Sequence, residues 1–175
     1  MGKQKIEALQ YFVHPKYNVA YDNDVALIEL SEPLKFSEYI KPVCLDNTVD
    51  PYPNEILTQC GMGSDFKQFL KEEYSHFSHD ILQDAPIQHI NSSICQRDKS
   101  RICLGGVNHS SLPGDSGGPL MAIRDNQWIQ IGICSTGSEK KFEDESISGH
   151  FLDYYMRVSY YCEWIKETTN NEVIC

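Results

Sequence analysis

The sequence contains no apolar run long enough to cross a lipid bilayer, so we expect no membrane insertion. Positive charge is scarce as well. The chain has 15 Lys and Arg residues against 25 Asp and Glu residues, which gives a net charge of -10. Nucleic acids and anionic membranes are polyanions, and this charge therefore argues against either as a partner. The first residues, Met1–Glu7, also do not form the apolar core of a secretory signal.

Cysteine, by contrast, is frequent, with seven residues in a chain of 175. That frequency is typical of an oxidising compartment and suggests an extracellular, secreted protein. An exported protein should carry a signal, and the simplest explanation is that upstream sequence is absent. Hydrophobic residues make up 41% of the chain, which suffices for a sizeable core in one or two small domains. We expect no cofactor and no metal site, because His76 and His79 have no evident third ligand.

Several stretches have the composition of β-strands, and two others suggest helices. Residues 5–13 are rich in β-forming side chains and end at a proline, and residues 25–30, 56–64 and 81–90 also predict strands. Pro86 within the last of these marks an edge or a bulge. Within residues 65–84, apolar side chains at positions 66, 69, 70, 74 and 77 favour a short amphipathic helix. Helical spacing also predicts a packing face formed by Tyr160, Tyr161, Trp164, Ile165 and Thr168.

The stretch with the clearest chemistry is Gly114–Leu120, Gly-Asp-Ser-Gly-Gly-Pro-Leu. Glycines on both sides of Ser116 allow backbone conformations that other residues avoid. Two backbone N–H groups can then converge on one point, as a developing oxyanion requires. Ser116 would present an exposed hydroxyl there, and it is therefore a candidate nucleophile. A glycine-rich turn with an incidental serine is the alternative.

This heptapeptide resembles the nucleophile loop of the chymotrypsin/trypsin-like serine endopeptidases. Further resemblances follow the family's order along the chain, at Asn23–Ile28, Lys41–Leu45, Ile131–Gly137, Tyr155–Val158 and Trp164-Ile165. The resemblance implies an all-β, antiparallel double β-barrel with an incomplete first barrel, a complete second barrel and a C-terminal helix. The expected domains are residues 1–50 (partial first barrel and crossing), 51–158 (second barrel) and 159–175 (C-terminal helix and tail).

The resemblance also implies the catalytic roles. Asp24 would orient a histidine base, Ser116 would be the nucleophile, and the N–H groups of Gly114 and Ser116 would form the oxyanion hole. Asp22 is a weaker choice for the aspartate, and Asp24 in a simple Asx-turn is the structural alternative. The segment that carries the family's histidine is missing, and His14 stands in a different context. The chain therefore resembles a truncated domain, and we expect it to be inactive as written.

Residues of the substrate cleft are implied in the same way. Ser110 falls at the base of the primary specificity pocket, and Asp153 falls on the opposite wall. Asp153 would either supply the counter-charge for a basic side chain or block the pocket. Ser135, Thr136 and Gly137 would pair with the substrate backbone, with Thr136 at a position where the family usually has tryptophan.

The cysteines follow the family only in part. Cys95 and Cys103 resemble a family disulfide. The family has cysteines at the positions of Leu112 and Ala122. The resemblance implies that a cysteine at position 122 would normally pair with Cys60. The pairing of Cys44, Cys60, Cys134, Cys162 and Cys175 stays open, with Cys162–Cys175 as a candidate brace for the helix. Asn91 and Asn108 begin glycosylation sequons.

Asp115 resembles the residue that pairs with the liberated N-terminal amine of the active enzyme, an amine not found in this chain. A buried carboxylate without its cation is disfavoured, which predicts a zymogen-like loop with a poorly placed Gly114 N–H group. The sequence thus predicts a serine endopeptidase acting through an acyl-enzyme on protein or peptide substrates, with protein inhibitors as further possible partners. The alternative is a non-catalytic homologue that binds proteins through the same cleft.

Overall fold

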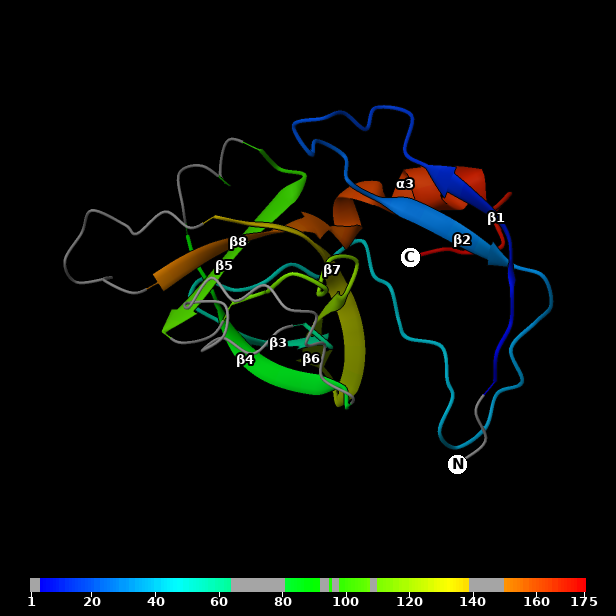
Figure 1. Ribbon diagram of the computed structural model, residues 1–175, viewed down its shortest axis with the longest axis horizontal. Helices are drawn as coiled ribbons and strands as arrows, with labels where there is room; N and C mark the ends of the chain where they lie inside the picture. Colours follow the sequence, from blue (N-terminus) through cyan, green and yellow to red (C-terminus); the bar gives the residue numbers. More distant parts are fainter. Residues whose placement is uncertain (1–3, 64–80, 92–94, 96–97, 108–109, 139–149) are drawn as a thin grey trace.

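A computed structural model describes residues 4–63, 81–91, 95, 98–107, 110–138 and 150–175. The described part of the chain is mostly β, with a helix near its C-terminus (Figure 1). The strands are β1 (Ala8–Val13), β2 (Ala26–Leu30), β3 (Ile56–Gly61), β4 (Gln83–His89), β5 (Arg101–Val107), β6 (Pro119–Arg124), β7 (Gln127–Ser138) and β8 (His150–Arg157). The helix α3 spans Val158–Thr168. The amphipathic helix expected within residues 65–84 falls largely on residues 64–80, and it therefore lies outside the described residues, as do His76, His79 and Asn108.

Six strands form one closed barrel, in the order β3-β4-β5-β8-β7-β6. The barrel interior is apolar and includes Leu57, Ile87, Ile102, Leu104, Leu120 and Ile131. Strands β1 and β2 form a separate antiparallel pair beside α3 (Figure 1). This arrangement confirms the predicted all-β class, with one complete barrel, a partial second sheet and a C-terminal helix.

The helix and the two-stranded sheet share a second apolar cluster. Val25, just before β2, is buried with Met156, Tyr161 and Ile165. Tyr161, Trp164 and Ile165 pack as the helical spacing predicted, but Tyr160 does not, since it is 55% exposed. The residues of α3 that are buried are Val158, Tyr161, Cys162 and Ile165. His14 also contacts this helix, with its ring 5.4 Å from that of Tyr161 and 5.0 Å from that of Trp164.

Pro86 lies where strand pairing is incomplete. It pairs with Thr58 of β3, but β4 meets β5 only at Gln88 and His89. A residue without an N–H group therefore costs no hydrogen bond on that side, which fits the edge position predicted for it.

Two disulfides occur among the described residues, Cys95–Cys103 and Cys162–Cys175, and both pairings were anticipated. Cys44, Cys60 and Cys134 are free. The strand register corrects one expectation. Thr58 pairs with Met121 and Gln59 with Leu120, so Ala122 lies opposite Leu57 and not opposite Cys60. Both Leu57 and Ala122 are 2% exposed and belong to the barrel core, so an apolar contact fills this position.

Because Leu57 fills the barrel interior opposite Ala122, we expect Leu57→Ala to lower the free energy of unfolding by about 2–5 kcal/mol. Urea denaturation followed by tryptophan fluorescence measures this loss. Ile56, its neighbour on the same strand, is 62% exposed and provides the matched control. Ile56→Ala should cost less than about 1 kcal/mol. Equal losses in the two variants would contradict the assigned register.

Candidate active site

Two consecutive tight turns shape the loop around Ser116. In the first, the Asp115 N–H donates to the Leu112 carbonyl at 2.9 Å, with Pro113 and Gly114 between them and Gly114 at a φ of +103°. In the second, the Gly118 N–H donates to the Asp115 carbonyl at 2.9 Å, and Gly117 has a φ of +82°. Both glycines occupy the third turn position, where a positive φ is required. Ser116 consequently sits at the exposed corner of the second turn.

The backbone N–H groups of this loop divide into two sets. Those of Asp115, Gly117 and Gly118 donate to carbonyls within the protein. Those of Gly114 and Ser116 have no acceptor in the part of the chain that the structure describes. The two N–H groups predicted to bind an oxyanion are therefore the two that remain available.

Asp24 approaches the same region from the two-stranded part. It precedes β2 and is half-buried, and its carboxylate accepts a hydrogen bond of 2.7 Å from the hydroxyl of Ser135 on β7. Asp24 and Ser116 line one pocket of about 640 Å³, whose other walls are largely apolar. Asp22, the competing choice, instead pairs with Arg101. The sequence-predicted carboxylate and hydroxyl thus share one cavity, and the Ser135 side-chain contact was not anticipated.

Neither His14 nor His89, the two histidines whose side chains are described, lines this pocket. The Nδ1 atom of His14 accepts from the Lys16 N–H, and His89 contacts the Tyr52 carbonyl at 2.8 Å. Burial, followed by the charge of Lys16, lowers the pKa of His14 below its ordinary value. Within the described ranges, no group of His, Cys, Asp and Glu side chains could hold a metal ion.

A buried carboxylate lies at the predicted specificity pocket. Asp153 on β8 is 0% exposed and accepts hydrogen bonds from the Ser110 hydroxyl at 2.9 Å and the Ser111 N–H at 2.8 Å. A Cβ atom on Gly137 would lie only 2.9 Å from the Asp153 carboxylate, so the carboxylate occupies the space that a larger residue at position 137 would need. Burial raises the pKa of Asp153 to about 6, although the serine hydrogen bonds act in the opposite direction. Ser110 and Asp153 are therefore in direct contact.

Among the described residues, residues 135–137 have a strand neighbour on one side only. Thr136 pairs with Tyr154 and Gly137 with Asp153, both on β8. On its other side β7 pairs with β6 only as far as Ile133, which lies opposite Pro119. Ser135–Gly137 therefore has a backbone edge to which an extended peptide can add.

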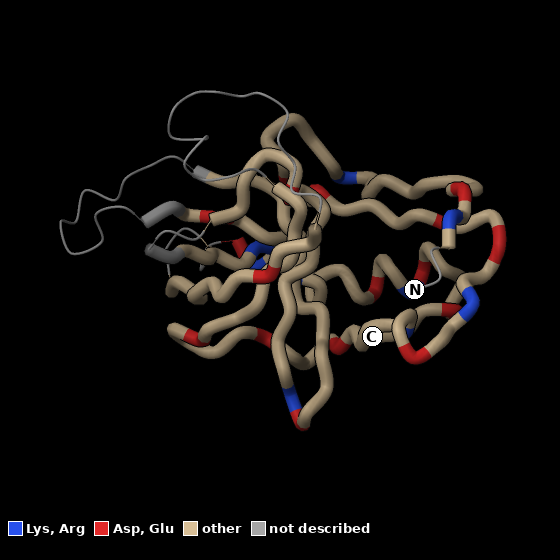
Figure 2. The backbone as a smooth tube through the Cα atoms, turned by 60° about the horizontal axis from the view of Figure 1, so that its bottom comes forward, with Lys and Arg blue, Asp and Glu red and all other residues tan. Residues whose placement is uncertain are grey.

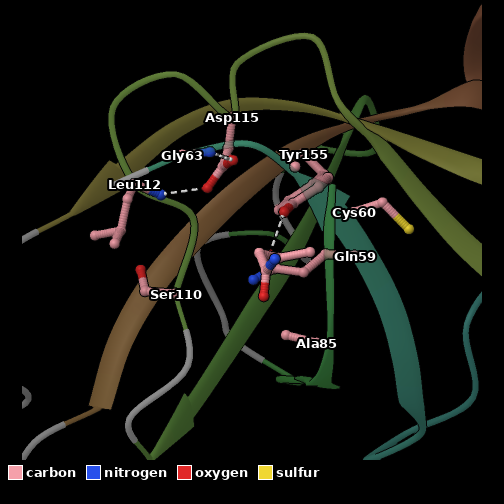
Figure 3. Close-up of a pocket in the computed structure, with 10 residues that line it drawn as sticks. Gln59, Cys60, Gly63, Ala85, Ser110, Leu112, Asp115 and Tyr155 are labelled. Carbon is pink, nitrogen blue, oxygen red and sulfur yellow. Dashed lines mark hydrogen bonds between the residues drawn. The ribbon is translucent and has the colours of Figure 1, made fainter. Parts of the chain in front are cut away.

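Asp115, which directly precedes Ser116, lines a second, smaller pocket (Figure 3). It has a volume of about 120 Å³, and its lining includes Ser110, Tyr155 and Asp115. The Asp115 carboxylate accepts from the Gly63 N–H at 2.8 Å and the Leu112 N–H at 2.9 Å. No Lys or Arg in the described part of the chain pairs with it. The Tyr155 hydroxyl donates to Gln59 at 2.6 Å, a contact that the sequence did not predict.

The barrel, the glycine-rich turns and the shared pocket define the class of chymotrypsin-like serine proteases. The chain belongs to the trypsin family, since the family model described as Trypsin matches residues 1–165. It is similar to Serine protease filzig of Drosophila melanogaster, with 29% identity over 172 residues. This match covers 90% of the chain and 9% of filzig, so the chain spans less than a tenth of that relative. The family has protein substrates, and the disulfides fit an extracellular location.

No helix in the described residues is both long and apolar enough to cross a membrane. Figure 2 shows that Asp and Glu residues are spread over the described chain and are not gathered in one place. Asn91 is exposed, as a glycosylation site requires.

The raised pKa of Asp153 predicts a pH-dependent stability. A carboxyl that titrates near 6 when folded and near 4 when unfolded keeps its proton longer in the folded state. Folded protein therefore loses stability as pH rises from 4 to about 6.5. We expect the unfolding free energy of the wild type to fall by about 2 kcal/mol relative to Asp153→Asn across this range.

Urea denaturation of both proteins at several pH values measures the difference, in which all other titrating groups cancel. A difference that does not change with pH would contradict the burial of a titrating carboxyl at this position.

Proposed function

We propose that this chain is the nucleophile-bearing part of a secreted serine endopeptidase. Ser116 attacks the scissile carbonyl and forms an acyl-enzyme. Asp24 orients an imidazole base, supplied by polypeptide outside these 175 residues, that occupies the pocket between Asp24 and Ser116. The observation that carries the proposal is that these two side chains line one cavity while the N–H groups of Gly114 and Ser116 have no acceptor in the described structure.

The proposed mechanism starts when a peptide adds to the Ser135–Gly137 edge as an extra strand. The imidazole accepts the Ser116 proton as the hydroxyl oxygen bonds to the substrate carbonyl carbon. The negative charge that develops on the carbonyl oxygen is stabilised by the Gly114 and Ser116 N–H groups. The imidazolium then protonates the leaving amine, and a water molecule, activated in the same way, hydrolyses the acyl-enzyme.

We infer that Ser110 lies at the base, and Asp153 on the opposite wall, of the pocket for the residue before the cleaved bond. With a pKa of about 6, Asp153 is mainly ionised at neutral pH. A buried carboxylate without a cationic partner attracts a basic side chain, because such a side chain neutralises it. The favoured substrates therefore carry Lys or Arg at this position.

The 175-residue chain alone should not hydrolyse peptides, because neither His14 nor His89, the histidines whose side chains are described, lines the Ser116 pocket, and Asp115 has no cationic partner among the described residues. The complete, activated protein should react with a fluorophosphonate probe at Ser116, as peptide mapping by mass spectrometry would establish. Ser116→Ala should abolish labelling. Ser37 is an exposed serine between β2 and β3, and Ser37→Ala should not change the labelling. An activated complete protein that stays unlabelled would favour a non-catalytic binding protein instead.

A second prediction concerns substrate choice. In the complete, activated protease, Asp153→Ser should lower kcat/KM for substrates with Lys or Arg before the scissile bond by about 100-fold or more. Substrates with an apolar residue there should be hydrolysed about as well as before. A parallel loss for both substrate types would contradict the proposed role of Asp153 and leave that of Ser116 intact.

A further inference from the structure

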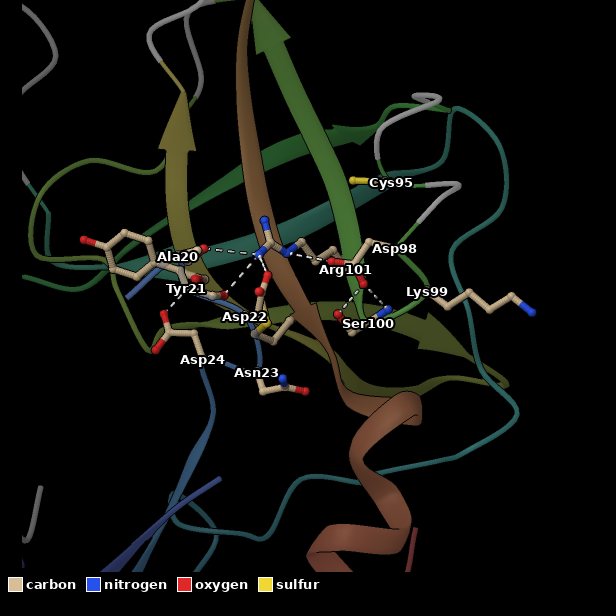
Figure 4. Close-up of polar contacts among 12 residues, drawn as sticks. Ala20, Tyr21, Asp22, Asn23, Asp24, Cys95, Asp98, Lys99, Ser100 and Arg101 are labelled. Carbon is tan, nitrogen blue, oxygen red and sulfur yellow. Dashed lines mark hydrogen bonds and ion pairs between the residues drawn. The ribbon is translucent and has the colours of Figure 1, made fainter. Parts of the chain in front are cut away.

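One arginine from the barrel holds the loop that carries Asp24. Arg101 begins β5, and its guanidinium reaches across to the segment before β2 (Figure 4). Its Nη2 atom donates to the Asp22 carboxylate at 2.7 Å and to the Tyr21 carbonyl at 3.2 Å. Two different groups of the loop are therefore bound by one side chain.

Arg101 is itself fixed on the barrel side. Its Nε atom lies 3.0 Å from an oxygen of Asp98, and its backbone carbonyl accepts from Arg157 at 2.9 Å. The other oxygen of Asp98 is held by the N–H and hydroxyl of Ser100. The Arg101 side chain is 17% exposed, whereas Asp22 and Asp98 are 49% and 39% exposed, so solvent still screens the two ion pairs in part. A planar, pre-organised guanidinium is well suited to bridge two carboxylates in this way.

The loop on the other side has a backbone that needs support. Tyr21 and Asn23 have φ values of +59° and +53°, in the left-handed region that residues other than glycine seldom adopt. Such conformations persist where surrounding contacts enforce them, and they often occur at functional sites. Asn18 supplies some of these contacts, because its side chain accepts from the Ala20 N–H and donates to the Asp22 carboxylate, both at 2.8 Å.

The two oxygens of the Asp22 carboxylate are thus held by different parts of the molecule. Asn18, within the loop, binds Oδ2, and Arg101, from the barrel, binds Oδ1. Only Asn23 separates Asp22 from Asp24, and the Val25 N–H donates to the Asn23 carbonyl at 2.8 Å. A shift of Asp22 would therefore be passed directly to Asp24 and to its 2.7 Å contact with Ser135.

We propose that Arg101 is a positioning residue that, through Asp22 and Tyr21, fixes the Asp24 carboxylate at its place in the pocket. This role rests on the proposed function, in which Asp24 orients the catalytic imidazole. Arg101 does not line the pocket that holds Ser116. Its effect on catalysis is therefore indirect, through the geometry of the loop.

The first test needs no enzymatic activity. In the 175-residue chain, Arg101→Gln should raise the hydrogen-exchange rates of the Ala20, Asp22 and Val25 amides by about tenfold, the scale of one lost charge-assisted hydrogen bond. Amides of the barrel core, such as that of Leu120, should exchange as in the wild type. Asp22→Asn, which removes the loop charge alone, should change the same amides in the same direction and by a smaller factor.

Arg124→Gln is the matched control. Arg124 on β6 is 18% exposed and forms an ion pair with Glu55 at 2.6 Å, so it resembles Arg101 in the burial of its own side chain but holds a different part of the chain. It should leave the exchange of the three loop amides unchanged. Unchanged loop exchange in both Arg101→Gln and Asp22→Asn would overturn the proposal.

The second test uses the complete, activated protease. Arg101→Gln should lower kcat about tenfold or more with KM within about twofold, because a misplaced catalytic group affects the transition state more than substrate binding. A less well placed Asp24 also stabilises the imidazolium less, so the acid limb of the pH–rate profile should move to lower pH. A contact that only stabilises the fold would not move this limb.

The two tests separate the possible failures. Arg101→Gln could speed up loop exchange and still have the same kcat and pH–rate profile as Arg124→Gln. That result would overturn the positioning role. A wild-type complete protease that leaves Ser116 unlabelled would overturn the proposed function, and with it the catalytic meaning of Arg101. The exchange result would then still report whether Arg101 holds the loop.

Discussion

The hydrogen bond from the Ser135 hydroxyl to the Asp24 carboxylate is the contact on which the candidate site depends. It joins the two-stranded part of the chain, at a carboxylate that lines the pocket with Ser116, to the closed barrel. Packing supports this contact on the Asp24 side. Val25, the residue after Asp24, is buried against Met156, Tyr161 and Ile165 at the junction of β8 and α3. The apolar cluster brings the two parts together, and the hydrogen bond sets where the carboxylate points.

The Ser116 loop achieves its geometry through the backbone alone. Two turns in succession use up the N–H groups of Asp115, Gly117 and Gly118, and those of Gly114 and Ser116 have no acceptor in the described structure. Both residues are exposed, and N–H groups without an acceptor in the described protein are donors that a ligand can use. The glycines are therefore required by the turns, and the availability of the two N–H groups is a consequence of that requirement.

Two carboxylates hold the segment between the predicted specificity pocket and the nucleophile loop. Consecutive N–H groups point in different directions, since that of Ser111 donates to Asp153 and that of Leu112 to Asp115. Leu112, at a position where the family has cysteine, therefore still lies in an anchored segment. Asp153 links the segment to β8, and Asp115 links it to Gly63 after β3. The pocket wall and the nucleophile loop are consequently parts of one hydrogen-bonded unit.

The sequence by itself determined the class of fold and four of the eight strands that the structure describes, and it predicted Asp24 and Ser116 as site residues, because turn chemistry, β-propensity and a seven-residue motif are local properties. It could not determine which distant residues meet. The register of β3 against β6 decided that Ala122 faces Leu57, a correction to the expectation for Cys60. Tyr160 likewise fits the helical spacing but points outward, because the position of α3 on the barrel decides which face is covered. The contacts of Asp24 with Ser135 and of Asp22 with Arg101 span 111 and 79 residues, and only tertiary folding brings such side chains together.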